Sequence, residues 1–190
     1  MDRQLEAIVG DLHAAGERLR ALYAAVPYDA WSQRPTPARW SPGECVAHLN
    51  LTSRALLPLL RDGLRRARAH AGRAPSLYRF DAIGWVIWTV MAPSAIVKTR
   101  TSAAFIPVVD VPVSSLVQDF EWLQSEIIAC VREAAGLPID RVTIVSPFDA
   151  RLTYNLYSAL RLTGRHQHRH LRQAERAVPL GAPVASPLAV

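Results

Sequence analysis

Cysteine, lysine and long apolar runs are scarce in this 190-residue sequence, and each shortage excludes a class of protein. The two cysteines, Cys45 and Cys130, are too few for a disulfide scaffold, so we expect a reducing compartment. The longest uncharged run, residues 82–97, is shorter than the roughly 20 residues of a spanning helix, and Pro93 interrupts it, so we expect no membrane span. Residues 1–6 are charged and lack the apolar segment of a secretion signal, which favours a cytoplasmic location.

The excess of basic residues consists almost entirely of arginine. Lys+Arg is 22 and Asp+Glu is 16, for a net charge of +6, and Lys98 is the only lysine. The densest basic group lies within residues 61–73 and lacks the interleaved aromatic residues that single-strand nucleic-acid binding uses. We interpret it as a solvated helix face and predict no specific nucleic-acid binding. Its members are Arg61, Arg65, Arg66, Arg68 and Arg73.

Apolar residues recur with helical spacing in four long segments, which predicts an all-α protein. Half of the residues are hydrophobic and 20% are charged, as expected for one folded domain. A shorter helix near residues 81–91 and extended pieces at 141–145 and 151–154 complete the pattern. The long helices are predicted at about residues 3–26, 42–69, 114–135 and 156–177.

The predicted architecture is a four-helix bundle in one domain, residues 1–177, followed by a flexible tail, residues 178–190. Residues 72–112 form a long crossover, so the second and third long helices are not a simple hairpin. The second long helix has the clearest start signal, because Ser41 stands at the N-cap, Pro42 at the first helical position and Glu44 at the third.

Three histidines are the candidate ligands of a divalent metal ion. His166 and His170 are four residues apart, which places both imidazoles on one face of the last helix. His168 points elsewhere and is not a predicted ligand. His48, shortly after the capped helix start, has apolar neighbours and is either a buried core histidine or a third ligand. Imidazole suits Zn and Ni, our first choices, as well as Fe and Cu, and Mn is a further candidate.

Three other side chains near these histidines have open roles. Glu44, one turn before His48, either relays a proton and orients an imidazole or only closes the capping box. Gln173, three residues after His170, is either a hydrogen-bonding partner of a ligand or an exposed residue. Cys45 is interpreted as a buried, inert thiol, with metal ligand or nucleophile as the alternatives.

Two segments resemble the DinB/YfiT-like metalloenzymes. Residues 40–49, WSPGECVAHL, are similar to the Trp-Ser…His-Leu signature of that superfamily, and residues 166–173, HQHRHLRQ, to its H-x-x-R-H-x-x-Q ending. Trp31 and the Ser-Pro-Phe sequence at 146–148 also fit. The resemblance extends over about residues 5–177, and its two ends are its most specific parts.

The resemblance implies an up-down-down-up four-helix bundle and a divalent metal held by His48, His166 and His170. Superfamily members with known activities include thiol S-transferases, an isomerase and hydrolases. We therefore expect a thiol S-transferase-like or hydrolase-like enzyme that acts on a small molecule, with a low-molecular-weight thiol as candidate co-substrate. The alternative is a non-catalytic bundle that binds a small ligand or forms a homodimer through the apolar region around Trp85 and Trp88.

Overall fold

The computed structural model describes residues 2–70, 72–92 and 101–179, and this part of the chain is mostly helical. The all-α prediction agrees with this, apart from one small two-stranded sheet. Part of the apolar run, residues 93–97, and most of the predicted tail, residues 180–190, lie outside the described residues. The long helices are α1 (Arg3–Ala25), α2 (Pro42–Ala69), α4 (Val113–Glu133) and α5 (Leu156–Ala177).

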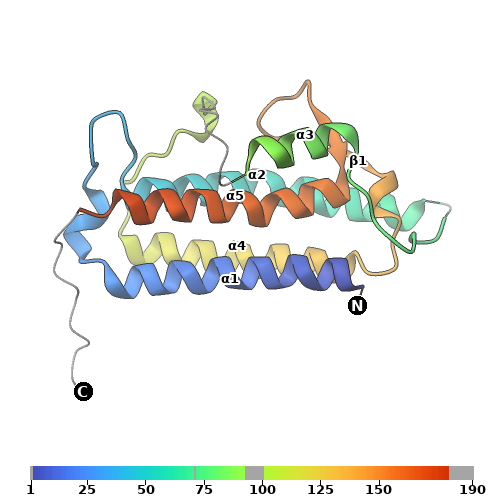
Figure 1. Ribbon diagram of the computed structural model, residues 1–190, viewed down its shortest axis with the longest axis horizontal. Coiled ribbons are helices and arrows are strands. Elements are labelled where there is room, and N and C mark those ends of the chain that lie inside the picture. The colour runs from blue at the N-terminus through green and yellow to red at the C-terminus, as the bar shows by residue number, and fades with distance from the viewer. Residues whose placement is uncertain (1, 71, 93–100, 180–190) are drawn as a thin grey trace, which may run out of the picture.

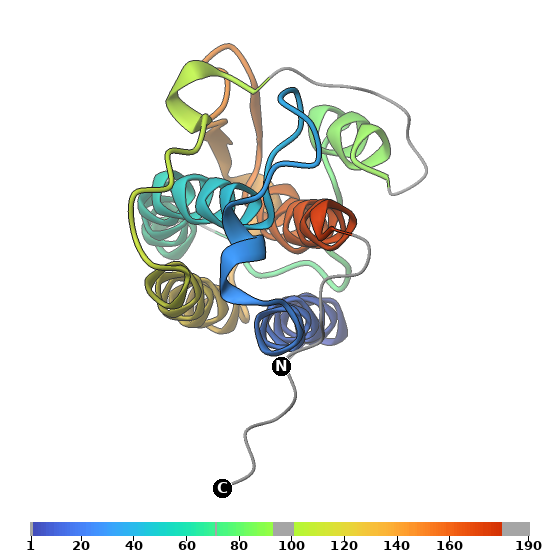
Figure 2. The same ribbon diagram turned by 90° about the vertical axis from the view of Figure 1, so that its left-hand side faces the viewer.

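The four long helices lie side by side along the long axis of the molecule. The chain runs one way in α1 and α5 and the opposite way in α2 and α4, as the colour gradient in Figure 1 shows. Helices α1 and α2 each pack against both α4 and α5, and the end-on view in Figure 2 shows the four in a square. Their observed limits differ from the sequence prediction by no more than two residues.

Capping explains where α2 and α5 begin. The Ser41 hydroxyl accepts a hydrogen bond from the Glu44 backbone N–H at 3.2 Å, and the Glu44 carboxylate accepts one from the Ser41 N–H at 2.8 Å. The predicted capping box is therefore confirmed. Asn155 caps α5 through a bond from the Ser158 N–H at 2.8 Å.

The core consists of two apolar clusters, one toward each end of the long helices. The first includes Leu60 and Ile127, and the second includes Leu49 and Phe120. A layer of buried polar side chains from α2, α4 and α5 lies between them. These side chains satisfy much of their hydrogen-bonding capacity internally, which makes the layer tolerable in a buried position. Its members include Asn50, Thr52, Ser53, Gln124, Thr163 and Gln167.

The crossover contains α3 (Ala82–Val90), which lies outside the square against α5 (Figure 1). The Asp81 carboxylate joins the two helices because it accepts bonds from the Gly84 N–H at 3.0 Å and the Ser158 hydroxyl at 2.9 Å. Its second oxygen accepts from the Asn155 N–H at 3.1 Å. Asp81 therefore caps α3 and fastens it to the start of α5.

The strands β1 (Thr143–Val145) and β2 (Thr153–Asn155) form an antiparallel pair with Ile144 opposite Tyr154. They match the two extended pieces predicted from the sequence. A short 3-10 helix, η2 (Ala103–Phe105), occupies the later part of the crossover.

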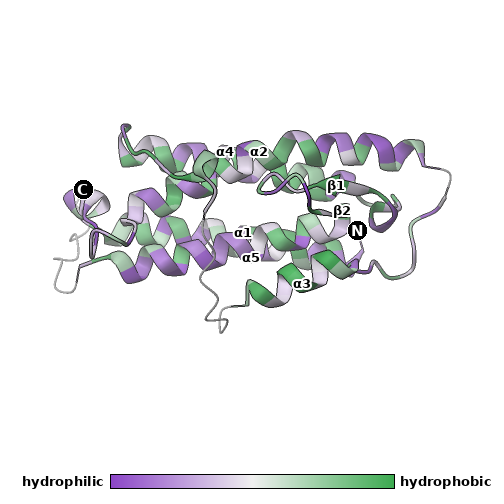
Figure 3. Ribbon diagram, turned by 90° about the horizontal axis from the view of Figure 1, so that it is seen from above, coloured by the Kyte–Doolittle hydropathy of each residue, from purple (hydrophilic) through white to green (hydrophobic). Residues whose placement is uncertain are grey.

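Helix α3 consists mostly of apolar residues, as its green colour in Figure 3 shows, and several of them are exposed. Trp85 is 56% exposed, with Ile83 and Val86 beside it. Trp88 is partly buried, with the Arg165 guanidinium carbon 4.0 Å from its ring centroid. Of the two tryptophans proposed for a homodimer interface, Trp85 is therefore the exposed one. No helix within the described ranges is both long and apolar enough to cross a bilayer.

Four of the five arginines of the predicted basic cluster form ion pairs, either within α2 or with α4. Arg61 pairs with Glu126 of α4, and Arg68 pairs with Glu133 at 2.7 Å. Arg65 and Arg66 both bond to Asp62. These four positions form a solvated, charge-compensated helix face, as the sequence interpretation expects. The absence of specific nucleic-acid binding stays a prediction.

Candidate metal centre

The structure brings the three candidate histidines together where α2 and α5 pack against each other. His48 projects from the second turn of α2, and His166 and His170 project from successive turns of α5. One ring nitrogen from each lies within 4.8 Å of the others. His48 is buried and the other two are partly buried. This group is compatible with a divalent metal site, and its donors are the neutral nitrogen ligands that such ions prefer.

Hydrogen bonds orient two of the three rings. His48 Nδ1 lies 2.8 Å from the Phe105 carbonyl oxygen, and His170 Nδ1 lies 3.1 Å from Gln173 Oε1. Both partners are acceptors, so each Nδ1 carries the proton and each Nε2 keeps its lone pair. His48 Nε2 faces His166 Nε2 at 3.4 Å. Metal-binding histidines commonly have this arrangement, in which the nitrogen away from the metal donates to an oxygen.

Burial favours the uncharged form of all three imidazoles. It lowers the pKa of His48, although the bond to Phe105 opposes it. The pKa of His166 is lowered well below its usual range by burial and then by His170 and His48. Burial, followed by the charge of His48, lowers the pKa of His170 to about 3. At pH 7 the rings are neutral, which is the form that binds a metal.

Aromatic side chains enclose the histidines. The Trp40 ring lies 4.9 Å from His48 and 6.0 Å from His170, measured between ring centroids. Phe148 lies 5.7 Å from His166 on another side. The Trp-Ser and Ser-Pro-Phe motifs quoted from the sequence therefore contribute directly to the walls of the candidate centre.

Glu44 is engaged in the helix cap. Its carboxylate accepts a bond from the Ser41 N–H and forms an ion pair with Arg34. Burial raises the pKa of Glu44, but the bonds from Arg34 and Ser41 and the charge of Arg34 outweigh it and lower the pKa overall. These contacts favour the capping interpretation. A proton relay between Glu44 and His48 stays a prediction.

Gln173 Oε1 lies 3.1 Å from His170 Nδ1, and its role at a metal centre stays a prediction. Replacing Gln173 with leucine removes the acceptor that orients His170. We expect metal affinity to fall about 10- to 100-fold, the usual effect of losing a hydrogen-bonding partner of a ligand. Calorimetric metal titration measures this loss. Gln173→Glu retains an acceptor and should largely restore affinity, whereas equal affinities in all three proteins contradict the prediction.

The sequence analysis predicted that His168 is not a ligand, but it did not predict the contact between Phe105 and His48. His168 Nε2 bonds to the Asp11 carbonyl oxygen at 3.0 Å, and His168 is outside the three-histidine group, as predicted. Phe105 was missed, because it acts through its backbone carbonyl and any residue supplies that group. No feature of the sequence in the crossover signals this contact.

Both cysteines are buried thiols outside the three-histidine group. Burial, together with the charge of Glu44, raises the pKa of Cys45 to about 12. Burial is also the main reason that the pKa of Cys130 rises to about 11. These values support the interpretation of Cys45 as inert.

We therefore expect little reaction of either thiol with a disulfide reagent in the folded protein at pH 8. The thiolate is the reactive species, and its fraction becomes appreciable only as pH rises toward 11–12. Absorbance of the released chromophore measures the rate, and the protein in denaturant provides the fully reactive control. Rapid labelling of the folded protein at pH 8 contradicts the prediction.

A pocket adjoins the histidine group at His166. It has about 550 Å³ of space, including the part open to solvent, and its walls come from α2, α3, α5 and the strand region. A metal held by the three histidines would therefore have a partly open pocket beside it. The sequence prediction did not include this pocket.

The sequence of this helical protein, with its three converging histidines, matches the model of a known superfamily. Residues 11–174 match the model of the DinB superfamily, and the chain belongs to that superfamily. This confirms the resemblance seen at the two ends of the sequence. No curated protein and no solved structure matches the chain.

Proposed function

We propose that the protein is a divalent-metal-dependent enzyme whose metal is held by His48, His166 and His170. The observation that carries the proposal is the convergence of three imidazole nitrogens within 4.8 Å. The hydrogen bonds that direct Nε2 of His48 and His170 away from their oxygen partners support it further. Zn and Ni are the first candidates, with Fe, Mn and Cu as alternatives.

The proposed bundle has up-down-down-up topology within a single domain, residues 1–177. The opposite chain directions of the helix pairs α1/α5 and α2/α4 support it (Figure 1). In this arrangement α2 and α5 lie beside each other, so ligands that are 118 residues apart reach one centre. Cytoplasmic location and homodimer formation stay predictions.

The proposed reaction is thiol S-transferase-like or hydrolase-like. A divalent ion bound by three imidazoles lowers the pKa of water or of a coordinated thiol. The protein's own contribution is to hold neutral imidazoles, to orient two of them through Phe105 and Gln173, and to flank them with the rings of Trp40 and Phe148. The substrate occupies the pocket beside His166.

A turnover screen tests this proposal. Metal-loaded protein is incubated with low-molecular-weight thiols plus electrophiles, and separately with esters, and products are measured by mass spectrometry. We expect one of the two reaction classes to proceed and His166→Ala to abolish it. His168→Ala is the matched control, since His168 is on the same helix but outside the group.

A non-catalytic ligand-binding bundle is the second candidate function. It is favoured by the engagement of the Glu44 carboxylate in the cap and the Arg34 ion pair, which leaves that group committed to structure. Ligand binding without product formation across the screen supports this candidate. Turnover that depends on His166 excludes it.

A further inference from the structure

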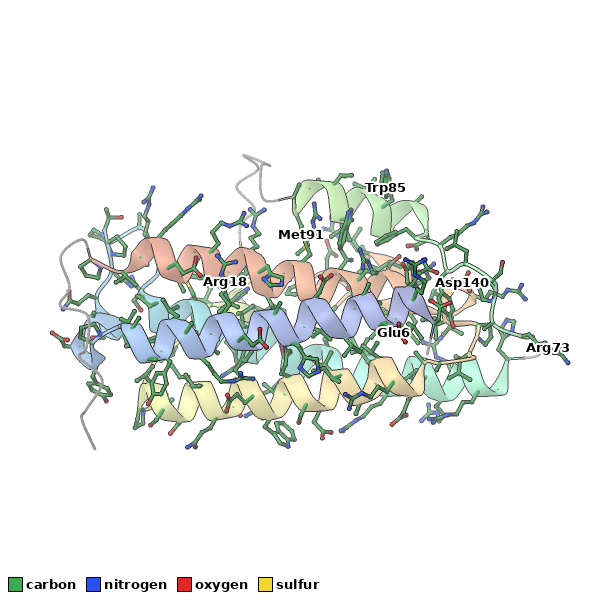
Figure 4. The ribbon with its side chains drawn as sticks, turned by 60° about the horizontal axis from the view of Figure 1, so that its bottom comes forward. Glu6, Arg18, Arg73, Trp85, Met91 and Asp140 are labelled. Atoms are coloured by element: carbon green, nitrogen blue, oxygen red, sulfur yellow. The ribbon has the colours of Figure 1, made fainter. Side chains whose placement is uncertain are left out.

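The walls of the pocket beside His166 lack the charged side chains that are common elsewhere in this protein. Helix α2 contributes Thr52 and Leu56, α3 contributes Ile87, and the strand region contributes Tyr154. Met91, at the end of α3 that lies over α5 in Figure 4, completes the wall opposite α2. The residues that line the pocket, within the described part of the chain, include no Asp, Glu, Lys or Arg.

Three of the polar side chains that line the pocket donate hydrogen bonds within the protein. Thr52 donates to the Leu49 carbonyl at 3.0 Å, and Thr163 donates to the Ala159 carbonyl at 2.8 Å. The Gln167 amide donates at 2.7 Å to a glutamine of α4. The pocket therefore presents apolar surface and uncharged polar groups, with no Lys or Arg in its lining to compensate an anion.

Away from the candidate metal position, an ionised ligand group would lose its hydration in this pocket without gaining a counter-charge from any lining side chain. Such a transfer is unfavourable, whereas an apolar group gains free energy when it leaves water.

We infer that this pocket binds an uncharged, largely apolar organic molecule, whose reacting end lies toward His166. The inference rests on the proposed function and adds the substrate class to it. Of the two substrates of a thiol transfer, the molecule in the pocket is the neutral electrophile. In a hydrolysis it is the apolar part of a neutral ester or amide.

Three probes of similar shape test the inference: phenylbutanol, phenylbutyrate and phenylbutylamine. At pH 7 they are neutral, anionic and cationic, and calorimetry with metal-free protein measures their binding. We expect the alcohol to bind at least about tenfold more tightly than either ion, because only the ions are desolvated without compensation. Binding of the acid or the amine as tightly as the alcohol overturns the inference.

Substitutions locate the binding. Ser53→Phe places a ring in the pocket from α2, and Met91→Trp narrows it from α3, so each should weaken binding of phenylbutanol at least about tenfold. Ser125→Phe is the matched control because Ser125 is exposed on α4, outside the pocket. Circular dichroism confirms folding of each variant. Unchanged affinity in a folded pocket variant overturns the inference.

Metal titration of the same proteins separates this inference from the proposed function. Loss of phenylbutanol binding in Ser53→Phe with normal metal affinity supports the pocket as a separate binding element. Absence of metal binding in the unmodified protein overturns the proposed function but leaves the neutral-ligand preference supported by the probes. Metal binding without any binding of phenylbutanol overturns the pocket inference alone.

Discussion

Replacement of His48 with alanine is expected to abolish stoichiometric metal binding. His48 is the single ligand that α2 contributes, and its Nε2 faces that of His166 at 3.4 Å. Loss of a residue that only supports a ligand costs about 10- to 100-fold in affinity, so loss of a ligand should cost more than about 100-fold. Metal analysis of untagged protein, followed by calorimetric titration, measures this effect.

Thermal unfolding gives a second readout of the same prediction. A ligand at 100 times its dissociation constant stabilises the folded state by about 2.7 kcal/mol, so added metal should raise the unfolding temperature of the unmodified protein. His48→Ala and His170→Ala should lose this shift, and His168→Ala should retain it. A folded His48→Ala protein that keeps its metal and its shift contradicts the three-histidine centre.

Replacement of Gly84 with alanine is expected to detach α3 from α5. A Cβ at this position would lie 2.2 Å from Ser158 Oγ and 2.4 Å from Ser158 Cβ, and also 2.6 Å from Asp81 Oδ1. These distances are too short for any side chain, and Ser158 is fully buried, so the helices must separate. Overpacking of this kind costs about 1–3 kcal/mol.

The expected result is a lower unfolding temperature together with weaker phenylbutanol binding, because α3 forms one wall of the pocket. Chemical denaturation and calorimetry measure the two effects. Gly10→Ala is the matched control. Gly10 is exposed on α1, and a Cβ added there would meet nothing within 4 Å. Alanine at this position should therefore stabilise the helix by up to about 1 kcal/mol. Equal stability of the two variants contradicts the prediction.

The helices were predictable from the sequence because the signals that define them are local. The Ser41–Glu44 capping box and the Asn155 cap mark helix starts through atoms no more than three residues apart. Apolar spacing gave the long helices, and the four-residue separation of His166 and His170 placed both on one face of α5.

Other features of the candidate centre were beyond sequence reasoning because they depend on contacts between distant segments. The carbonyl group that orients His48 is part of the Phe105 backbone, and every residue has such a group, so the residue type does not reveal the contact. The pocket needs walls from three helices and the strand region. The bond from Ser158 to Asp81 joins residues 77 positions apart, and nothing local to either one indicates it.

The sequence by itself determined the helices, their caps, the family and the candidate ligands. The tertiary structure decided that α2 and α5 pack in the register that brings His48 to His166, that Arg34 pairs with Glu44, and that a pocket without charged lining residues lies beside His166. The physical reason is the distance along the chain over which the interactions act. Helix formation and capping depend on neighbours within about four residues, whereas the register between two helices depends on the packing of all the side chains between them.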